Sequence, residues 1–195
     1  MSISVLPRTQ ASSTNSRHFA PRSLLPLETE SCWKIETGVV RALSWLEDGT
    51  VVTLGLWGAG EIVGKTLAQI DPYQLECLTK VEATRLQTDN WLQTQSALLA
   101  HIQQAGELTL IRSHRRVDMM LLKLLNWLGK KFGRQVEQGQ LIDLRLTHQD
   151  IADMLGSTRV TITRTLNQLE QQGLIRRLSL QRIVLQEEEV WHYEI

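Results

Sequence analysis

Residues 147–177 of the chain read THQDIADMLGSTRVTITRTLNQLEQQGLIRR, and they predict more of the structure than any other segment. Thr147 precedes Asp150 by three residues, which resembles a capping box and predicts the start of a short helix. This helix has apolar residues at the i, i+3, i+4 spacing of one buried stripe: Ile151, Met154 and Leu155. Gly156 can leave the helix at positive φ. Two short helices joined by a glycine turn predict a helix-turn-helix, a motif that places its second helix in the major groove of DNA.

The second helix of this stretch is expected to have two different faces. Its buried stripe has apolar residues at spacings of four and three: Ile162, Leu166 and Leu169. At about 100° per residue, the opposite face carries Val160, Thr163, Arg164 and Asn167, with Arg159 beside it at the helix start. Ser157 is expected to cap this helix, and Gly173 to end it. The alternative is a solvated surface helix, but the caps, the glycine turn and the stripe together agree better with the DNA-binding motif.

A hairpin is predicted directly after the second helix. Its strands are Leu174–Arg177 and Arg182–Leu185, and its turn lies at Ser179–Gln181. A hairpin in this place is typical of a winged helix, in which the wing meets the phosphate backbone of DNA. The expected phosphate contacts are Arg176, Arg177 and Arg182.

The charge distribution agrees with a DNA partner, although the formal net charge is zero. Residues 1–111 carry 8 Lys and Arg against 11 Asp and Glu, and residues 185–195 carry 0 against 4. Residues 112–184 carry 13 against 6, so the positive excess lies in the segment that holds the predicted helix-turn-helix. Binding to phosphate requires an excess of this kind.

Composition argues against several other classes of protein. The two cysteines, Cys32 and Cys77, have no second cysteine nearby, which disfavours a disulfide framework and an iron–sulfur site. The five histidines show no metal-ligand spacing, and no apolar run approaches the length of a membrane span. No glycine-rich phosphate loop or nucleophile elbow indicates an enzyme. We therefore expect a cytoplasmic protein without a cofactor, a metal or a membrane partner.

The N-terminal half predicts a tail followed by a β-rich domain. Residues 1–23 are rich in Ser, Thr, Arg and Pro and are expected to be a disordered tail. Residues 24–89 contain short strand-like segments separated by turns, at 33–36, 39–46, 50–56 and 75–86. The Asp48-Gly49 pair is a hairpin signal. These features predict a β-sandwich or jelly roll, which would be an effector-type domain.

Residues 90–113 predict one long helix. The spacing of four, three and four predicts a coiled-coil seam for dimerisation, formed by Leu98, Ile102, Ala105 and Thr109. The alternative is a helix that packs only on its own sandwich. Residues 114–195 are expected to form the winged-helix domain, with a hinge at 113–118, a buried helix that ends at Gly133 and a strand at 141–146. The predicted fold class is thus α+β.

A sandwich, a long helix, a hinge and a C-terminal winged helix, in this order, resemble the CRP/FNR family of transcription regulators over residues 24–186. The runs 142–152 and 156–164 are especially similar to the cyanobacterial nitrogen-control branch of the family. The resemblance implies a sequence-specific regulator that binds a palindromic promoter site as a homodimer and contacts RNA polymerase.

The resemblance also assigns residues on the recognition helix. The family reads bases with an Arg-x-x-x-x-Arg pattern, which Arg159 and Arg164 match. A guanidinium can bond bidentately to guanine O6 and N7. Val160 stands where another branch has Glu, and it can touch a thymine methyl group but cannot accept from cytosine N4. Half-sites of the GTA/TAC type are therefore implied, with Thr158 and Thr163 as phosphate or base-edge contacts.

The effector pocket departs from the family pattern. Cyclic-nucleotide binders carry Gly-Glu and later Arg-Ser, whereas this chain has Lys65-Thr66 and Leu75-Glu76 at those places. Glu76 would repel a phosphate, so binding of cAMP is not expected.

The nitrogen-control branch binds 2-oxoglutarate through an arginine and a glutamate, which fall at His101 and Gly106 here. The effector is therefore unassigned. The alternative function is a small-molecule-sensing or protein-interaction module that has lost DNA binding.

Overall fold

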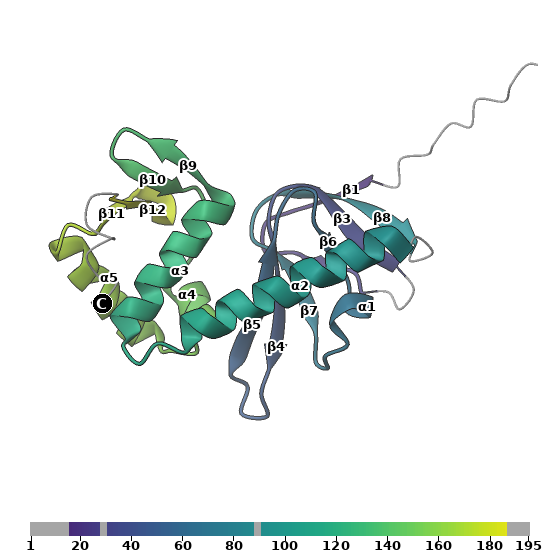
Figure 1. The fold of residues 1–195 in the computed structure, drawn as a ribbon, viewed down its shortest axis with the longest axis horizontal. Helices are drawn as coiled ribbons and strands as arrows, with labels where there is room; N and C mark the ends of the chain where they lie inside the picture. Colours follow the sequence, from purple (N-terminus) through teal and green to yellow (C-terminus); the bar gives the residue numbers. More distant parts are fainter. Residues whose placement is uncertain (1–15, 28–30, 88–90, 187–195) are drawn as a thin grey trace, which may run out of the picture.

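The computed structural model describes residues 16–27, 31–87 and 91–186. A β-sandwich and a winged-helix domain lie at the two ends of an elongated molecule (Figure 1). Helix α2 (Trp91–Arg112) runs from the sandwich to the winged-helix domain. The predicted α+β class and the order of the parts are confirmed. The described part contains no helix long and apolar enough to span a bilayer.

The sandwich consists of two four-stranded antiparallel sheets with the strand orders β1-β8-β3-β6 and β2-β7-β4-β5. A short helix, α1 (Lys65–Ala68), follows β6. The strands are β1 (Ser16–Phe19), β2 (Leu24–Leu25), β3 (Ser31–Thr37), β4 (Val40–Trp45), β5 (Val51–Trp57), β6 (Ile62–Val63), β7 (Gln74–Cys77) and β8 (Val81–Gln87). This arrangement is the predicted jelly roll. The predicted hairpin is β4–β5, and Gly49 has a φ of 83° in its turn.

The prediction of a disordered tail over residues 1–23 is wrong at the C-terminal end of this segment, where Ser16–Phe19 form β1. Strand β1 pairs with β8, and the ring of Phe19 lies 5.5 Å from that of Trp33 in an edge-to-face contact. Strand β2 pairs with β7. These segments are ordered because they complete the edges of the two sheets, which local composition does not reveal. Residues 1–15 and 187–195 lie outside the described residues, as does the expected domain boundary at 89/90.

The single strand expected at 75–86 is two strands in different sheets, β7 and β8. Between them the Leu78 amide donates to the Val39 carbonyl at 2.9 Å. The Val39 amide in turn donates to Thr79 Oγ1 at 2.9 Å. These bonds hold the bend by which the chain crosses from one sheet to the other.

The winged-helix domain contains three α-helices and a four-stranded sheet of order β11-β12-β10-β9. Its elements are α3 (Val117–Phe132), β9 (Gly133–Val136), β10 (Gly139–Ile142), α4 (His148–Leu155), α5 (Arg159–Gln171), β11 (Ile175–Leu178), a 3-10 turn (Ser179–Gln181) and β12 (Arg182–Leu185). The strand expected at 141–146 ends at Ile142 instead. Its partners end there, because Ile142 pairs with the first residue of β9 and with Ile183 near the start of β12.

Two apolar cores hold the molecule together. One lies inside the sandwich, where Trp33, Trp57 and Tyr73 are at most 5% exposed. The other joins the domains: Val39, Leu56 and Leu78 of the sandwich belong to the same buried cluster as the residues of α3, α4 and α5. The sandwich and the winged helix therefore share a continuous apolar interface.

Candidate nucleic-acid interface

The first helix of the motif, α4, begins as the sequence predicts. The Asp150 amide donates to Thr147 Oγ1 at 3.0 Å, and the Thr147 amide donates to Asp150 Oδ2 at 2.8 Å. This is a complete capping box. Gly156 follows the helix with a φ of 64°, as expected for a left-handed turn.

The second helix, α5, is capped by Thr158 and not by Ser157. Thr158 has an extended backbone, and its Oγ1 accepts the amide of Thr161 at 3.2 Å. Ser157 lies one residue too early, because the turn takes up both Gly156 and Ser157. The predicted end is confirmed, since Gly173 has a φ of 75° after the helix.

The outer face of α5 is open to solvent. The predicted apolar stripe of Ile162, Leu166 and Leu169 is buried, whereas Val160 is 69% exposed. The exposed side chains also include those of Arg159, Arg164 and Asn167. Among the described residues, neither the Arg159 nor the Arg164 guanidinium group has a hydrogen bond or an ion pair, so both groups are available for a ligand.

Thr163 and His148 form a contact that the sequence did not reveal. The Thr163 hydroxyl donates to the Arg159 carbonyl at 2.8 Å and lies 2.8 Å from His148 Nδ1. His148 is the first residue of α4, and only the packing of α4 on α5 brings it to this face. Burial lowers the pKa of His148, and the nearby Arg177 and Arg159 guanidinium groups lower it further.

The wing is formed as predicted, but one of its arginines binds the protein itself. Arg177 Nε donates to Glu170 Oε2 at 2.8 Å, and the Arg177 amide donates to Glu170 Oε1 at 2.9 Å. These hydrogen bonds lower the pKa of Glu170. Arg177 therefore ties β11 to α5, and its expected role as a phosphate contact stays a prediction. Arg176 is exposed, while Arg182 lies 3.7 Å from Asp143.

Helix α2 packs on the sandwich with one face and leaves the other open. Its buried residues include Ala97, Gln104 and Leu108. The expected seam lies on the open face: Leu98 is 43% and Ile102 is 60% exposed, and Ala105 and Thr109 are exposed as well. The same face carries three residues that the four-three-four spacing did not include: Leu99, Gly106 and Leu110.

Residues that the sequence aligns with the family's effector site make contacts within the protein itself. Leu75 points into the sandwich and is fully buried, whereas Glu76 pairs with Arg41 at 2.6 Å. Lys65 forms an ion pair with Asp71 at 2.9 Å. Cys32 and Cys77 are buried free thiols, and the described residues contain no cluster of three potential metal ligands.

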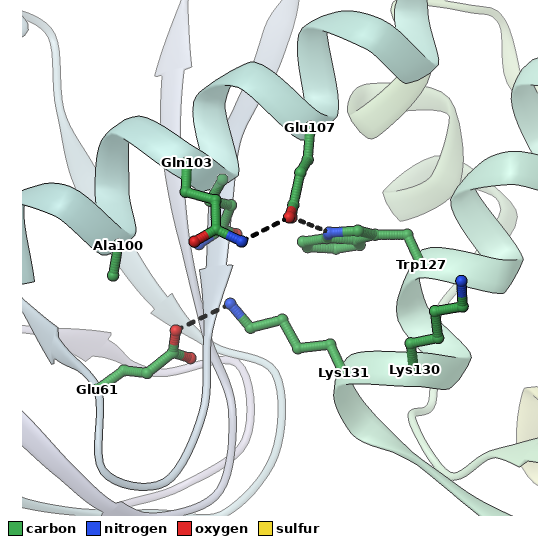
Figure 2. A pocket seen from close by; sticks show the side chains of 8 residues that line it. Glu61, Ala100, Gln103, Glu107, Trp127, Lys130 and Lys131 are labelled. Atoms are coloured by element: carbon green, nitrogen blue, oxygen red, sulfur yellow. Dashed lines mark hydrogen bonds and ion pairs between the residues drawn. The ribbon is translucent and has the colours of Figure 1, made fainter.

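Helix α3 is attached both to the sandwich and to α2 (Figure 2). Lys131 Nζ lies 2.9 Å from Glu61 Oε1, and Trp127 Nε1 donates to Glu107 Oε2 at 2.7 Å. The bond from Trp127 lowers the pKa of Glu107. These side chains border a hollow of about 340 Å³ between α2 and α3.

Together, these features define a class: a winged-helix DNA-binding protein with a jelly-roll domain and a long connecting helix. Residues 115–190 match the Crp-like helix-turn-helix domain. The chain is 42% identical over 159 residues to Regulatory protein CysR of Synechococcus elongatus, which covers 80% of this chain and 77% of that protein. It belongs to the CRP/FNR family of transcription regulators.

Two further similarities agree with this assignment. The chain is 44% identical over 63 residues to the Global nitrogen regulator of Synechococcus elongatus. This match covers 32% of this chain and 28% of that protein. The fold is similar to that of a solved CRP-family transcriptional regulator from Thermus thermophilus, with a TM-score of 0.76 and 21% identity over 88% of this chain and 92% of that chain.

Proposed function

We propose that this DNA-binding transcription regulator acts as a homodimer on a palindromic promoter site with half-sites of the GTA/TAC type. The observation that carries the proposal is the pair Arg159 and Arg164, which lie unengaged on the exposed face of α5. Each guanidinium matches O6 and N7 of a guanine in the major groove. Val160 lies between them in sequence and suits a thymine methyl group.

Residues around this pair are proposed to make further contacts with DNA. Arg176 and Arg182 of the wing, and Thr158 at the start of α5, are proposed to bind phosphate and so to position the helix. Thr163 and Asn167 lie further along the reading helix as base-edge contacts. Arg177 supports binding indirectly, because it fixes the wing to α5 through Glu170.

The open face of α2 supports the homodimer. Four apolar side chains on this face are between 43% and 71% exposed: Leu98, Leu99, Ile102 and Leu110. A second copy of α2 would cover them in a parallel seam, with Ala105, Gly106 and Thr109 allowing close approach. Two recognition helices would then face successive major grooves, about 34–36 Å apart.

The proposed regulator does not bind cAMP. Leu75 and the large side chains of Trp33, Trp57 and Tyr73 fill the interior of the sandwich, and Glu76 adds a negative charge on its outer side. RNA polymerase is proposed as the protein partner at the promoter, in a cytoplasmic setting, and no enzymatic activity is proposed.

Replacing Arg164 by Ala tests the assignment of the reading residues. We expect Arg164→Ala to weaken binding to the palindrome by about 1–3 kcal/mol and to relax the preference for guanine. Arg176→Ala is the matched control, because loss of a phosphate contact weakens binding to specific and random DNA alike. Dissociation constants on both DNAs, measured over a salt series, distinguish the two effects.

Equal losses on specific and random DNA for Arg164→Ala would reject the assignment. If the wild-type protein bound neither DNA even at low salt, the alternative function would gain support, namely a sensing or protein-interaction module without DNA binding.

A further inference from the structure

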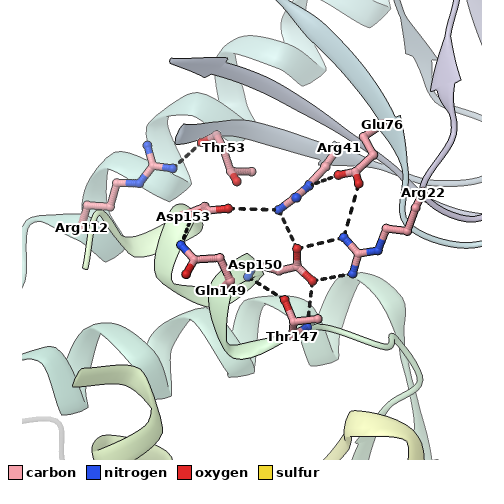
Figure 3. A network of polar contacts seen from close by, with 9 residues as sticks. All are labelled: Arg22, Arg41, Thr53, Glu76, Arg112, Thr147, Gln149, Asp150 and Asp153. Atoms are coloured by element: carbon pink, nitrogen blue, oxygen red, sulfur yellow. Dashed lines mark hydrogen bonds and ion pairs between the residues drawn. The ribbon is translucent and has the colours of Figure 1, made fainter. Parts of the chain in front are cut away.

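A buried network of charged side chains joins the sandwich to the first helix of the DNA-binding motif (Figure 3). We call it the interdomain network, and its members are Arg22, Arg41, Glu76, Asp150 and Asp153. Two guanidinium groups of the sandwich thus meet one carboxylate of the sandwich and two of α4. Apart from Arg22, every member has a side chain that is at most 14% exposed.

The sandwich side of the network is rigid. Arg41 and Glu76 are directly opposite on the neighbouring strands β4 and β7, and Arg41 Nε donates to Glu76 Oε2 at 2.6 Å. The residues beside Arg41, Val40 and Ala42, point into the sandwich core. Since side chains alternate along a strand, Arg41 must point out of the sandwich toward α4.

On the side of the DNA-binding domain, the Asp150 carboxylate contacts the guanidinium groups of both Arg22 and Arg41. Arg22 binds it bidentately at 2.9 and 2.6 Å, and Arg41 lies 3.0 Å from its Oδ1. The same carboxylate closes the capping box with Thr147. Asp153 lies 3.7 Å from Arg41 and accepts from Gln149 at 2.7 Å. The network therefore contacts side chains from both turns of α4.

Arg112, the last residue of α2, makes a further link between the domains. Its Nε donates to the carbonyl of Met154 in α4 at 2.7 Å, and its NH2 group donates to the carbonyl of Thr53 in β5. On the other side of the domain, Lys131 of α3 binds Glu61 (Figure 2). The winged helix is thus attached to the sandwich from two sides.

The geometry points to Arg22 and Arg41 as positioning residues for DNA binding. By binding Asp150 and Asp153, the two arginines hold α4 at a fixed orientation to α2, and α5 is held with it. The distance between the two recognition helices of a dimer is then set by the protein itself, without a small-molecule effector.

Two features of the network support this role. Buried ion pairs contribute little net stability but penalise every arrangement in which a charge loses its partner, so they select one orientation of the two domains. The network also acts on α4 and leaves the reading face of α5 exposed. The domain is therefore held in an orientation in which its arginines remain accessible.

The test separates positioning from simple stability, and it rests on the proposed homodimer. Arg22→Gln is the variant of choice, because Arg22 is 39% exposed and Arg41 still neutralises Asp150 in its absence. Binding is measured on a duplex with one GTA half-site, on the palindrome with half-site centres about 10 base pairs apart, and on palindromes with one or two base pairs added or removed.

For Arg22→Gln we expect unchanged affinity for the single half-site, a loss of about tenfold on the optimal palindrome and a flatter dependence on spacing. Arg22→Lys keeps one charged contact and should restore part of the loss. Lys80→Gln removes the same charge from an exposed position of the sandwich and should behave as wild type.

An equal loss on half-site and palindrome would show a merely structural role for Arg22 and overturn the proposal. An unchanged spacing profile would overturn it as well. Native mass spectrometry of the wild-type protein must show that the binding-competent species carries no small molecule, since a bound one would contradict effector independence. A wild-type protein that binds no DNA would overturn the proposed function instead.

Discussion

Two arginines of the DNA-binding domain differ in the groups around them. Arg164 is free, whereas Arg177 is held by Glu170 with two bonds from its side chain and one from its backbone amide. A guanidinium that is bonded in this way must break those bonds to reach a phosphate. Arg177→Ala should therefore act through the placement of the wing.

His148 is expected to make DNA binding pH-dependent. Because the Thr163 hydroxyl donates to the Arg159 carbonyl, Nδ1 of His148 is the donor to Thr163, and Nε2 is left to accept. The pKa of His148 is lowered in the free protein by burial and by Arg177 and Arg159. A DNA phosphate nearby would raise it, so the complex takes up a proton as pH falls.

Protonation of His148 thus strengthens DNA binding. This gain in affinity is absent at pH values above the pKa of His148 in the DNA complex, and it is complete at pH values below the pKa of His148 in the free protein. Between pH 8 and pH 5.5 we expect the wild type to gain up to about tenfold in affinity for each unit by which DNA raises the pKa. His148→Gln should abolish this gain, while His114→Gln, at an exposed position of the same domain, should keep it. Parallel pH profiles for wild type and His148→Gln would contradict the prediction.

Helix α2 combines a face that packs on its own sandwich with a face that no other described residue covers. Gln104 illustrates the first face, because its Oε1 accepts the amide of Leu56 in β5 at 2.5 Å. Ile102 illustrates the second, with 60% of its surface exposed. Helix α2 thus packs on its own sandwich with one face, while the dimer seam predicted for the open face stays a prediction.

Ile102→Glu is expected to dissociate the dimer and leave the fold intact. A buried pair of carboxylates in the seam would be strongly unfavourable, whereas the single chain keeps this position in water. Sedimentation should change from about twice the 22.2 kDa of the chain to the monomer mass. Leu46→Glu, at a position of the β4–β5 turn that is 56% exposed, is the control. A dimeric Ile102→Glu protein would place the interface elsewhere.

The molecule as a whole is expected to lose interdomain stability in acid. Burial raises the pKa of Asp150, but bonds from Arg22 and Thr147 and the charge of Arg41 outweigh it, so that the net shift is downward. A carboxyl whose pKa is lower in the folded state than in the unfolded state stabilises the fold at pH values above its unfolded-state pKa. This contribution is lost as pH falls through its folded-state pKa.

The free energy of unfolding should therefore be about 1–3 kcal/mol lower for Arg22→Gln than for wild type at pH 7, and the difference should shrink as pH falls through the lowered pKa of Asp150. Urea unfolding at several pH values measures it. The pKa of Asp153 is raised, so its contribution to stability has the opposite pH dependence. This contribution is present in both the wild type and Arg22→Gln, so it largely cancels in the difference between them. A difference that grows in acid would contradict the assignment of Arg22 to Asp150.

Most of the elements and the exposed face of α5 could be predicted because they depend on neighbours in sequence. Thr147, Asp150 and Gly156 act within one helical turn, and the stripe of Ile162, Leu166 and Leu169 follows the helical period. The edge strand β1 could not be predicted, because it depends on pairing with β8, more than 60 residues away, and on the contact of Phe19 with Trp33.

Spacing, caps and charge in the chain were sufficient for the winged helix, the long helix, the jelly roll and the exposed position of Arg159 and Arg164, since each of these has a local signature. The interdomain network was decided only by tertiary structure. Arg22 and Asp150 are 128 residues apart, and nothing near either residue indicates the other. Their contact exists because the sandwich packs against α4 through β5, which brings Arg22 and Arg41 to the Asp150 carboxylate, whose burial makes a partner of opposite charge obligatory.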